Sequence, residues 1–427
     1  MEKFIINGGK PLNGEITVGG AKNSVLPILA GTLLIDGISV IHNCPNLSDV
    51  RATIKILEYL GCNIKRENHT VIVDATNVKN SEVPDDLMRE MRSSIIFLGS
   101  ILGRMGKVTL SSPGGCEIGL RPIDLHLSSA KMLGVNIKSQ NGLIICEKGD
   151  KGLVGNKITL SFPSVGATEN IILMAVLSKG TTVINNAASE PEISDLSDFL
   201  NRCGAKIHGA GTGTVVIDGV KKLHGAEHTV IPDRIEAASY LMATAVTKGN
   251  VTISNIIPAH LNTVLMPLRE TGCNIEVKGK SVTLNAPLNL KRFKIVRTMP
   301  YPYFPTDAQA QLTALATVCK GTSVVVENIF ESRFKYVGEL LRFGAKISIE
   351  SRMAVIEGVK SLYGAKVKAT DLRGGFAMMI AGLCAEGETT ITDIYHIDRG
   401  YENPEKVLKK LGADVERVTL NGTEKNK

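Results

Sequence analysis

The segment at residues 111–126 combines residue types that can act on an anionic substrate. Glycine and proline residues leave few side chains to bury there, so the segment is predicted to be a mobile loop. Cys116 lies in this loop, and Arg121 follows five residues later. A guanidinium group binds phosphate or carboxylate through two parallel hydrogen bonds. A thiol beside it predicts an active-site lid, although a cysteine flanked by glycine is also common as a small buried side chain.

The composition narrows the classes of protein to consider. The chain has 427 residues, of which 43% are hydrophobic and 21% charged, so we expect a globular protein of two or three domains. Its formal charge of +7 is mild and no block of Lys and Arg is present, so neither nucleic acid nor a membrane is expected as a partner. Its apolar runs fall short of the roughly 20 residues that a membrane helix requires. Small anionic molecules are the expected partners.

The eight cysteines favour a reducing compartment. They are scattered, with no Cys-x-x-Cys pair and no histidine at the spacing of a zinc site. A cytoplasmic location is the simplest setting for such thiols. The sequence also lacks a phosphate-binding Gly-x-x-x-x-Gly-Lys loop and the Rossmann glycine spacing. We therefore expect no metal ion and no cofactor.

The elements that must position the reactive residues repeat along the chain. A glycine, then any residue, then Asn, Lys or Asp, then Ile or Val recurs six times at intervals of about 70 residues. The six glycines are Gly61, Gly134, Gly204, Gly272, Gly344 and Gly412. A second glycine at the same interval follows an apolar helical run and precedes alternating β-branched residues. Each unit is predicted to run helix, strand, helix, strand, strand, which is enough for one compact α/β layer.

Polar residues precede the first helix of each repeat. Ser, Asp and Thr at such positions are ordinary N-caps. Lys and Arg are not explained in this way, because a cation in the first turn opposes the helix dipole by about 0.3–1 kcal/mol. Helix N-termini also attract phosphate groups. We therefore expect the six helix starts to converge on an anionic ligand, together with the side chains of Lys22, Arg92, Arg234 and Arg373.

Two motifs resemble those of the enolpyruvyl transferases. They are Gly-Gly-Cys-x-Ile-Gly-x-Arg-Pro-x-Asp-Leu-His at 114–126 and Ile-Asp-Arg-Gly-Tyr-Glu at 397–402. The resemblance covers almost the full length and implies a two-domain inside-out α/β barrel. Each domain would hold three βαβαββ repeats of about 70 residues. Residues 22–229 would form the domain that carries the Cys116 lid, and residues 1–21 with 230–427 the other, discontinuous domain.

The resemblance also implies an activity. The enolpyruvyl group of phosphoenolpyruvate would move to the 3-hydroxyl of UDP-N-acetylglucosamine with release of phosphate, the first committed step of peptidoglycan synthesis. A proton adds to the methylene carbon while a hydroxyl adds to the neighbouring carbon, so the reaction needs an acid and a base. The resemblance assigns Cys116 as the proton donor and Asp307 as the candidate base.

Further residues match substrate-binding positions of the family. Phosphoenolpyruvate is expected to contact Lys22, Asn23, Arg121 and Arg399, and Lys22 is also expected to take part in catalysis. The nucleotide sugar is expected to contact Arg92, Arg121, Pro122, Ile123, Asp124, Leu125, Asp307 and Ile329. One departure concerns Phe162 and Pro163, which stand where some relatives carry a lysine that contacts the nucleotide.

Two alternative functions stay open. The sister enzyme 5-enolpyruvylshikimate-3-phosphate synthase shares the fold and the chemistry of phosphoenolpyruvate, but it lacks the lid with the cysteine. A noncatalytic scaffold that binds anions is the other alternative. The joint presence of Lys22, Cys116, Asp307 and Arg399 argues against a scaffold, because a scaffold requires none of the four.

Overall fold

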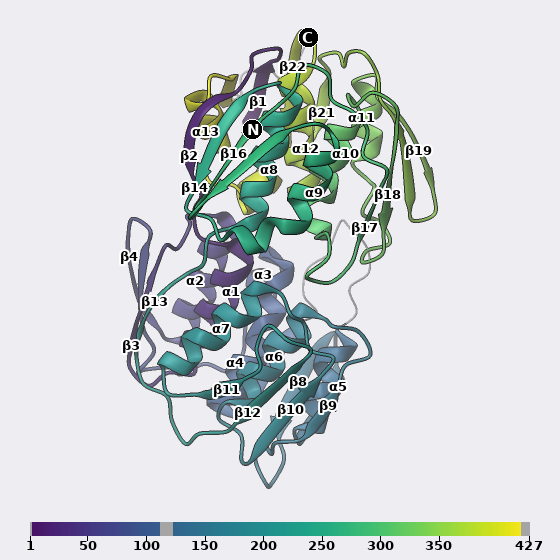
Figure 1. Ribbon diagram of the computed structural model, residues 1–427. Coiled ribbons are helices and arrows are strands. Elements are labelled where there is room, and N and C mark those ends of the chain that lie inside the picture. The colour runs from purple at the N-terminus through teal and green to yellow at the C-terminus, as the bar shows by residue number, and fades with distance from the viewer. Residues whose placement is uncertain (1, 112–122, 420–427) are drawn as a thin grey trace. The chain divides into compact units, whose positions relative to one another are not determined.

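The computed structural model describes residues 2–111 and 123–419, which form two compact units (Figure 1). The terminal unit contains residues 2–19 and 232–419, and the central unit contains residues 20–111 and 123–231. The chain passes from one unit to the other after Gly19 and again after Ile231. These crossings lie close to the boundaries that the family resemblance implies, after residues 21 and 229.

Three four-stranded sheets belong to the terminal unit. Their strands are β1 (Glu2–Asn7), β2 (Asn13–Thr17), β14 (Asn250–Ser254), β15 (Asn274–Lys278), β16 (Ser281–Asn285), β17 (Ile295–Thr298), β18 (Thr322–Glu327), β19 (Lys346–Glu350), β20 (Met353–Glu357), β21 (Lys366–Lys368), β22 (Glu388–Thr392) and β23 (Asp414–Thr419). The strand orders are β21-β22-β1-β23, β15-β16-β14-β2 and β17-β18-β20-β19. Each sheet joins one parallel pair to antiparallel pairs, and β1 lies between strands from the C-terminal part of the chain.

The central unit repeats this plan. Its strands are β3 (Ile38–His42), β4 (Asn63–Glu67), β5 (Thr70–Asp74), β6 (Lys107–Ser111), β7 (Val135–Gln140), β8 (Leu143–Lys148), β9 (Lys157–Thr159), β10 (Thr181–Asn185), β11 (Lys206–His208), β12 (Thr214–Asp218) and β13 (Glu227–Thr229). They form the sheets β13-β3-β5-β4, β11-β12-β10-β9 and β6-β8-β7. In the three-stranded sheet, a single parallel bridge between Glu82 and Thr109 takes the edge that β13 and β9 occupy in the others.

Each unit also contains its own set of helices. The terminal unit contains α8 (Arg234–Val246), α9 (Asn262–Glu270), α10 (Gln309–Ala316), α11 (Val337–Arg342), α12 (Leu372–Cys384), α13 (Pro404–Lys410) and the 3-10 helices η2 (Pro258–Leu261), η3 (Thr306–Ala308) and η4 (Ile394–Arg399). The central unit contains α1 (Lys22–Thr32), α2 (Ser48–Leu60), α3 (Asp85–Glu90), η1 (Arg92–Ile96), α4 (Phe97–Met105), α5 (Asp124–Met132), α6 (Val165–Ala175) and α7 (Pro191–Arg202).

The inner helices of the terminal unit are α8, α10 and α12. They are buried on nearly all sides and contact one another, as expected of helices that are apolar all round. By contrast, α2 buries one stripe with helical spacing, including Val50, Thr53, Ile56, Leu57 and Leu60. In the upper part of Figure 1, the sheets of the terminal unit lie outside these inner helices. The expected α/β fold with helices inside and sheets outside is confirmed.

The six glycines that revealed the repeat share one backbone conformation. All of them follow the second helix of their repeat, and their φ angles lie between 86° and 108°. This left-handed conformation ends a helix at little cost only in glycine, because a Cβ atom opposes it. The same turn therefore leads from the second helix to the next strand in each repeat.

Each unit has its own hydrophobic core. One core joins β1 and β2 to the elements after residue 232, and the other lies within residues 21–230. Each core is built from apolar residues of its own unit, so each unit has the hydrophobic core of a separate domain. Within the described residues, no helix is long and apolar enough to cross a membrane.

Candidate functional site

Lys22 is the first residue of α1, and its ammonium group is held by a buried carboxylate. Lys22 Nζ lies 2.9 Å from Asp49 Oδ2, and the two side chains are 10% and 3% exposed. Asp49 belongs to the first turn of α2. The backbone before α1 is also constrained, because a Cβ atom on Gly20 would lie 1.8 Å from the carbonyl oxygen of Asn43. The helix start and its cation are therefore fixed in the central unit.

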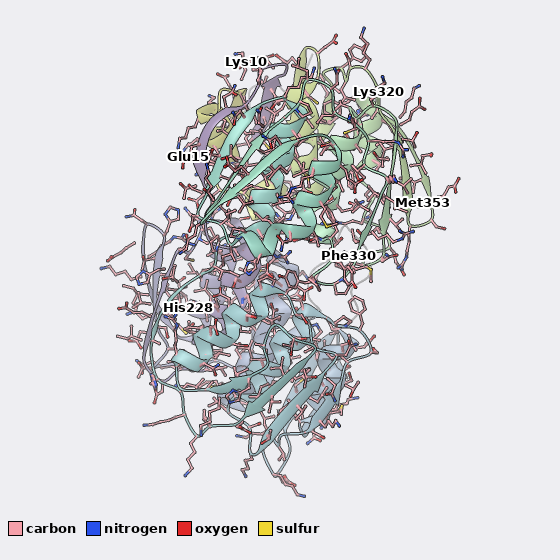
Figure 2. The ribbon with its side chains drawn as sticks, in the orientation of Figure 1. Lys10, Glu15, His228, Lys320, Phe330 and Met353 are labelled. Atoms are coloured by element: carbon pink, nitrogen blue, oxygen red, sulfur yellow. The ribbon has the colours of Figure 1, made fainter. Side chains whose placement is uncertain are left out.

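A second buried carboxylate supports the same helix start. Asp195 on α7 accepts a short hydrogen bond from the Ser24 hydroxyl and another from the Ile231 amide, at 3.2 Å. Asp195 Oδ1 also lies 2.8 Å from His228 Nε2. The side chains of Asp195, Ser24 and His228 are buried, and Figure 2 marks His228. Ser24 comes two residues after Lys22, so Asp195 helps to set the position of the first turn of α1.

The segments expected to bind the nucleotide sugar lie on neighbouring elements of the central unit. Arg92 begins η1, which contacts both α1 and α6. Ile123 precedes α5, and Ile123 and Leu125 pack partly against the core, whereas Asp124 is exposed. The expected site residues Cys116, Arg121 and Pro122 lie outside the described residues.

Asn170 on α6 joins these neighbouring elements. Its Oδ1 accepts a hydrogen bond of 2.6 Å from the Gly99 amide. Its Nδ2 donates to the carbonyl oxygens of Ile95 and Gly166, at 3.2 and 3.3 Å, and lies 2.8 Å from His126 Nδ1. Asn170 is fully buried, so these bonds are protected from water. One side chain thereby fixes α6 against η1, α4 and α5.

Asp307 in the terminal unit is held by two arginines. Its Oδ1 lies 3.2 Å from Arg333 Nη2, and its Oδ2 lies 3.1 Å from Arg373 Nη2. The two arginine side chains are 3% and 2% exposed, while the Asp307 side chain is 26% exposed. Two guanidinium groups at this distance favour the charged form of a carboxylate. Asp307 is therefore an oriented carboxylate whose side chain is partly exposed.

The helix starts show which expected N-caps form. Ser164 accepts from the Ala167 amide at the start of α6, Asp233 caps α8, and Asp371 caps α12. These three caps follow the prediction from residue type. At α1 the N-cap is Ala21, which offers no side-chain acceptor. The start of α1 therefore has no side-chain cap, and its first residue, Lys22, forms the ion pair with Asp49.

The helix starts gather within each unit. In the terminal unit, Arg373 at the start of α12 pairs with Asp307 in η3 and interacts electrostatically with Asp233 at the start of α8. The guanidinium carbon of Arg234 lies 5.6 Å from the centre of the Tyr301 ring, a cation–π distance. In the central unit, η1 contacts α1 and α6. The terminal unit therefore brings the charged residues at three helix starts close together, and in the central unit the three corresponding helices include neighbours in contact.

Glu327 at the end of β18 organises the segment that contains Ile329. Its Oε1 accepts from the amides of Ile329 and Phe330, at 2.7 and 3.1 Å, and its Oε2 accepts from the Thr306 hydroxyl at 2.9 Å. Glu327 is 1% exposed, and Figure 2 marks Phe330, the residue after Ile329. The Ile329 amide is thus already used, so a backbone contact from Ile329 to a ligand would involve its carbonyl oxygen.

Arg399 is the last residue of η4, a half-buried position. The residues around it are anchored on both sides. Asp398 pairs with Arg417 through bonds of 2.5 and 3.0 Å, and Gly400 packs so closely on Leu372 that a Cβ atom would lie 2.7 Å from its Cδ1. The position of Arg399 is therefore set by the start of α12 and by β23.

The described cysteines are poorly suited to reaction. Cys62, Cys203 and Cys273 are buried. Burial raises the pKa of Cys62 and of Cys203 to about 12, so their reactive thiolate forms are scarce at neutral pH. In residues 2–111 and 123–419, no group of three His, Cys, Asp or Glu side chains is placed to hold a metal ion.

Several residues that hold the site together escaped sequence reasoning, among them Asp49, Asp195, Glu327, Arg333 and Asn170. Asp195 had a visible signal, since a charged residue on the apolar stripe of a predicted helix is unusual. The others look locally like surface residues or caps. Only the tertiary fold shows that they are buried against a partner.

Comparisons with known proteins agree with these features. The model of a family described as EPSP synthase (3-phosphoshikimate 1-carboxyvinyltransferase) matches residues 6–415. UDP-N-acetylglucosamine 1-carboxyvinyltransferase 2 of Caldanaerobacter subterraneus subsp. tengcongensis is 54% identical over 418 residues, which cover 98% of this chain and 100% of the relative. UDP-N-acetylglucosamine 1-carboxyvinyltransferase of Finegoldia magna is 49% identical over 423 residues, which cover 98% of this chain and 100% of the relative.

Solved structures share the fold. The enolpyruvyl transferase NikO from Streptomyces tendae superposes with a TM-score of 0.88 at 25% identity, covering 98% of this chain and 99% of the other. EPSP synthase from Acinetobacter baumannii superposes with a TM-score of 0.76 at 17% identity, covering 98% and 100%, which supports the fold alone. With a family model matched over nearly its whole length and relatives about half identical to it, the chain belongs to the enolpyruvyl transferase family.

Proposed function

We propose that this chain transfers the enolpyruvyl group of phosphoenolpyruvate to the 3-hydroxyl of UDP-N-acetylglucosamine and releases phosphate, the first committed step of peptidoglycan synthesis. The observation that carries the proposal is the identity of 54% and 49% to full-length transferases of that name. The two units supply an ammonium and a carboxylate that are each held by buried counter-charges, as polar catalysis requires. The scattered cysteines favour the cytoplasm as the place of reaction.

The domain organisation follows the family. We infer that residues 22–229 act as the enolpyruvyl transferase domain that carries the Cys116 loop. Residues 1–21 and 230–427 act as the second, discontinuous domain, and each domain has three repeats. The residues of the two hydrophobic cores divide at the same two points of the chain to within a few residues, which supports the assignment.

Phosphoenolpyruvate needs cations for both its phosphate and its carboxylate. Lys22 and Arg399 serve this role together with Arg121, and Asn23 adds a polar side chain beside Lys22. The support comes from the fixed positions of Lys22 and Arg399, because an oriented cation stabilises a departing phosphate without reorganisation. No metal ion or cofactor is required for this arrangement.

The transfer itself needs a proton donor and a proton acceptor. Cys116 gives a proton to the methylene carbon of phosphoenolpyruvate, and the sugar 3-hydroxyl oxygen bonds to the neighbouring carbon. Asp307 is the candidate base that takes the hydroxyl proton, and the partial exposure of its side chain supports this role. The added proton is then lost from the methyl group as the carbon–oxygen bond to phosphate breaks, which restores the double bond.

We propose that the nucleotide sugar contacts the residues that match the family's positions. They are Arg92, Arg121, Pro122, Ile123, Asp124, Leu125, Asp307 and Ile329. The hydrogen bonds of Asn170 support the first set, because they fix the elements on which it lies. The bond from the Ile329 amide to Glu327 leaves the Ile329 carbonyl for the ligand.

Release of inorganic phosphate tests the function. Purified protein is given phosphoenolpyruvate with UDP-N-acetylglucosamine, with shikimate 3-phosphate, or with no acceptor. We expect release only with the nucleotide sugar. Release with shikimate 3-phosphate would identify the sister activity, and no release with either acceptor from folded protein would favour the noncatalytic scaffold.

The same assay tests the proton donor. We expect Cys116→Ser to lose activity by about a hundredfold or more. Cys384→Ser is the control, because the pKa of that thiol is raised to about 12 by burial and its thiolate is scarce. Full activity of Cys116→Ser would remove Cys116 from the role of acid.

A further inference from the structure

Tyr401 is a buried side chain that the proposed mechanism does not use, although it lies two residues after Arg399. It is 1% exposed. Its hydroxyl lies 2.7 Å from Ser239 Oγ on α8 and accepts a hydrogen bond of 2.9 Å from Gln311 Nε2 on α10. Ser239 donates its own proton to the Ile235 carbonyl, at 2.7 Å, so the Tyr401 hydroxyl is the donor to Ser239. The phenol group is therefore engaged as both donor and acceptor.

The ring of Tyr401 reaches the third inner helix. It stacks on Phe376 of α12 with ring centres 4.1 Å apart and an angle of 22°. The guanidinium carbon of Arg373, also on α12, lies 5.4 Å from the centre of the Tyr401 ring. Arg373 is the residue that binds Asp307. Tyr401 thus contacts α8, α10 and α12, the three inner helices of the terminal unit.

The chain between Tyr401 and Arg399 has little freedom. Gly400 is buried, and a Cβ atom at this position would lie 2.7 Å from Leu372 Cδ1 at the start of α12. Movement of Tyr401 would therefore be transmitted through Gly400 to Arg399. Displacement of an oriented group by about 1 Å can reduce catalysis by about a hundredfold.

We propose that Tyr401 is a positioning residue: its hydroxyl and ring hold the end of the segment that contains Arg399 against the three inner helices, and so set the geometry in which phosphoenolpyruvate is bound. This inference rests on the proposed function, because it assigns Arg399 to phosphoenolpyruvate. It adds a residue that touches no substrate and acts through Arg399.

The chain offers a matched control in Tyr240 on α8. Tyr240 is also 1% exposed and also packs on Phe376, with ring centres 5.5 Å apart and an angle of 89°. Its hydroxyl makes no hydrogen bond to any described residue. Tyr240→Phe and Tyr401→Phe therefore remove the same atom from the same aromatic cluster, but only the second removes hydrogen bonds.

Steady-state kinetics of the full-length protein separate a positioning role from a structural one. We expect Tyr401→Phe to lower kcat/KM for phosphoenolpyruvate by about tenfold or more, with KM for UDP-N-acetylglucosamine changed less than about twofold. Tyr240→Phe should match the wild type in both constants. Equal constants for the two variants, or a loss shared equally by both substrates, would overturn the proposal.

A second pair of variants guards against a folding defect. Ser239→Ala and Gln311→Met each remove one partner of the Tyr401 hydroxyl and leave the ring in place. We expect the same selective loss for phosphoenolpyruvate, of smaller size, and unchanged constants in both would overturn the proposal. A wild-type protein that releases no phosphate with either acceptor would instead refute the proposed function, so the two failures are distinguishable.

Discussion

The two units hold their key charges in opposite ways. In the central unit, the Lys22 ammonium is paired with one buried carboxylate, Asp49. In the terminal unit, the Asp307 carboxylate is paired with two buried guanidinium groups, Arg333 and Arg373. Lys22 is almost buried at 10% exposure, whereas Asp307 keeps 26% of its side chain exposed.

The difference in partners and in exposure suits the two charges to different roles. A buried ammonium that is paired with a buried carboxylate is a cation held in a fixed position. A carboxylate that is paired with two arginines is held in one orientation, and part of its side chain stays exposed. In both units the counter-charge, and not the helix N-terminus alone, fixes the functional group.

The largest expected effect concerns the more exposed charge. Asp307→Asn keeps the shape but removes the proton acceptor, so we expect kcat to fall by about a thousandfold. The fall should appear in steady-state phosphate release with both substrates saturating. Asp198→Asn, an exposed change on α7, is the control and should be inert. An Asp307→Asn variant that keeps its kcat would show that the carboxylate is only a structural partner of the arginines.

The ion pair of the central unit predicts a loss of stability that a second substitution restores. Asp49→Asn leaves the Lys22 ammonium buried without its carboxylate, so we expect the free energy of unfolding to fall by about 3 kcal/mol. Adding Lys22→Met should recover most of this loss without recovering activity. Denaturant unfolding of both variants measures the effect, and additive losses in the double variant would contradict it.

A smaller effect is expected where the chain passes from one unit to the other, after Gly19 and after Ile231. The Ile231 amide is held by Asp195, and the Gly19 amide is held by Glu236 Oε2 at 3.2 Å. Asp195→Asn weakens bonds to Ser24 and Ile231, so we expect a loss of about 2 kcal/mol in unfolding free energy and a higher KM for phosphoenolpyruvate. Asp198→Asn on the same helix should change neither. If the two variants behave alike, Asp195 does not support the start of α1.

A further effect is a dependence on pH in the terminal unit. Burial raises the pKa of Glu236 from 4.5 to about 8, and nearby Asp233 adds to the shift. Between these values the folded protein keeps a proton that the unfolded chain has lost. The unfolding free energy therefore falls as pH rises, by at most about 1.4 kcal/mol per pH unit.

Glu236→Gln removes this titration and can still accept from the Gly19 amide. We expect its unfolding free energy to decline less than that of the wild type between pH 5 and pH 8. Denaturant unfolding at pH 5, 6, 7 and 8 makes the comparison. Parallel curves for the two proteins would show that Glu236 does not titrate in this range.

Local patterns predicted the repeat, the elements and part of the site. The repeated glycines indicated where helices end, because only glycine adopts that backbone conformation without strain. Ser164, Asp233 and Asp371 were recognisable as caps because capping involves neighbours in sequence. Residues that depend on near neighbours were therefore within reach of the sequence.

The partners of the key charges were not predictable in this way. Arg373 lies 66 residues from Asp307, and Arg333 lies 26 residues away. Tyr401 meets Ser239 across 162 residues. These pairs form because separate repeats close around shared inner helices, and periodicity within one repeat carries no information about that closure.

The chemical structure of the reaction product is the most direct test of enolpyruvyl transfer to the sugar 3-hydroxyl. The protein is incubated with phosphoenolpyruvate and UDP-N-acetylglucosamine, and the product is analysed by mass spectrometry and NMR. We expect one new ether, with the enolpyruvyl group on the 3-hydroxyl of the sugar and one inorganic phosphate released for each product formed. An enolpyruvyl group on another hydroxyl, or phosphate release without a new ether, would contradict it.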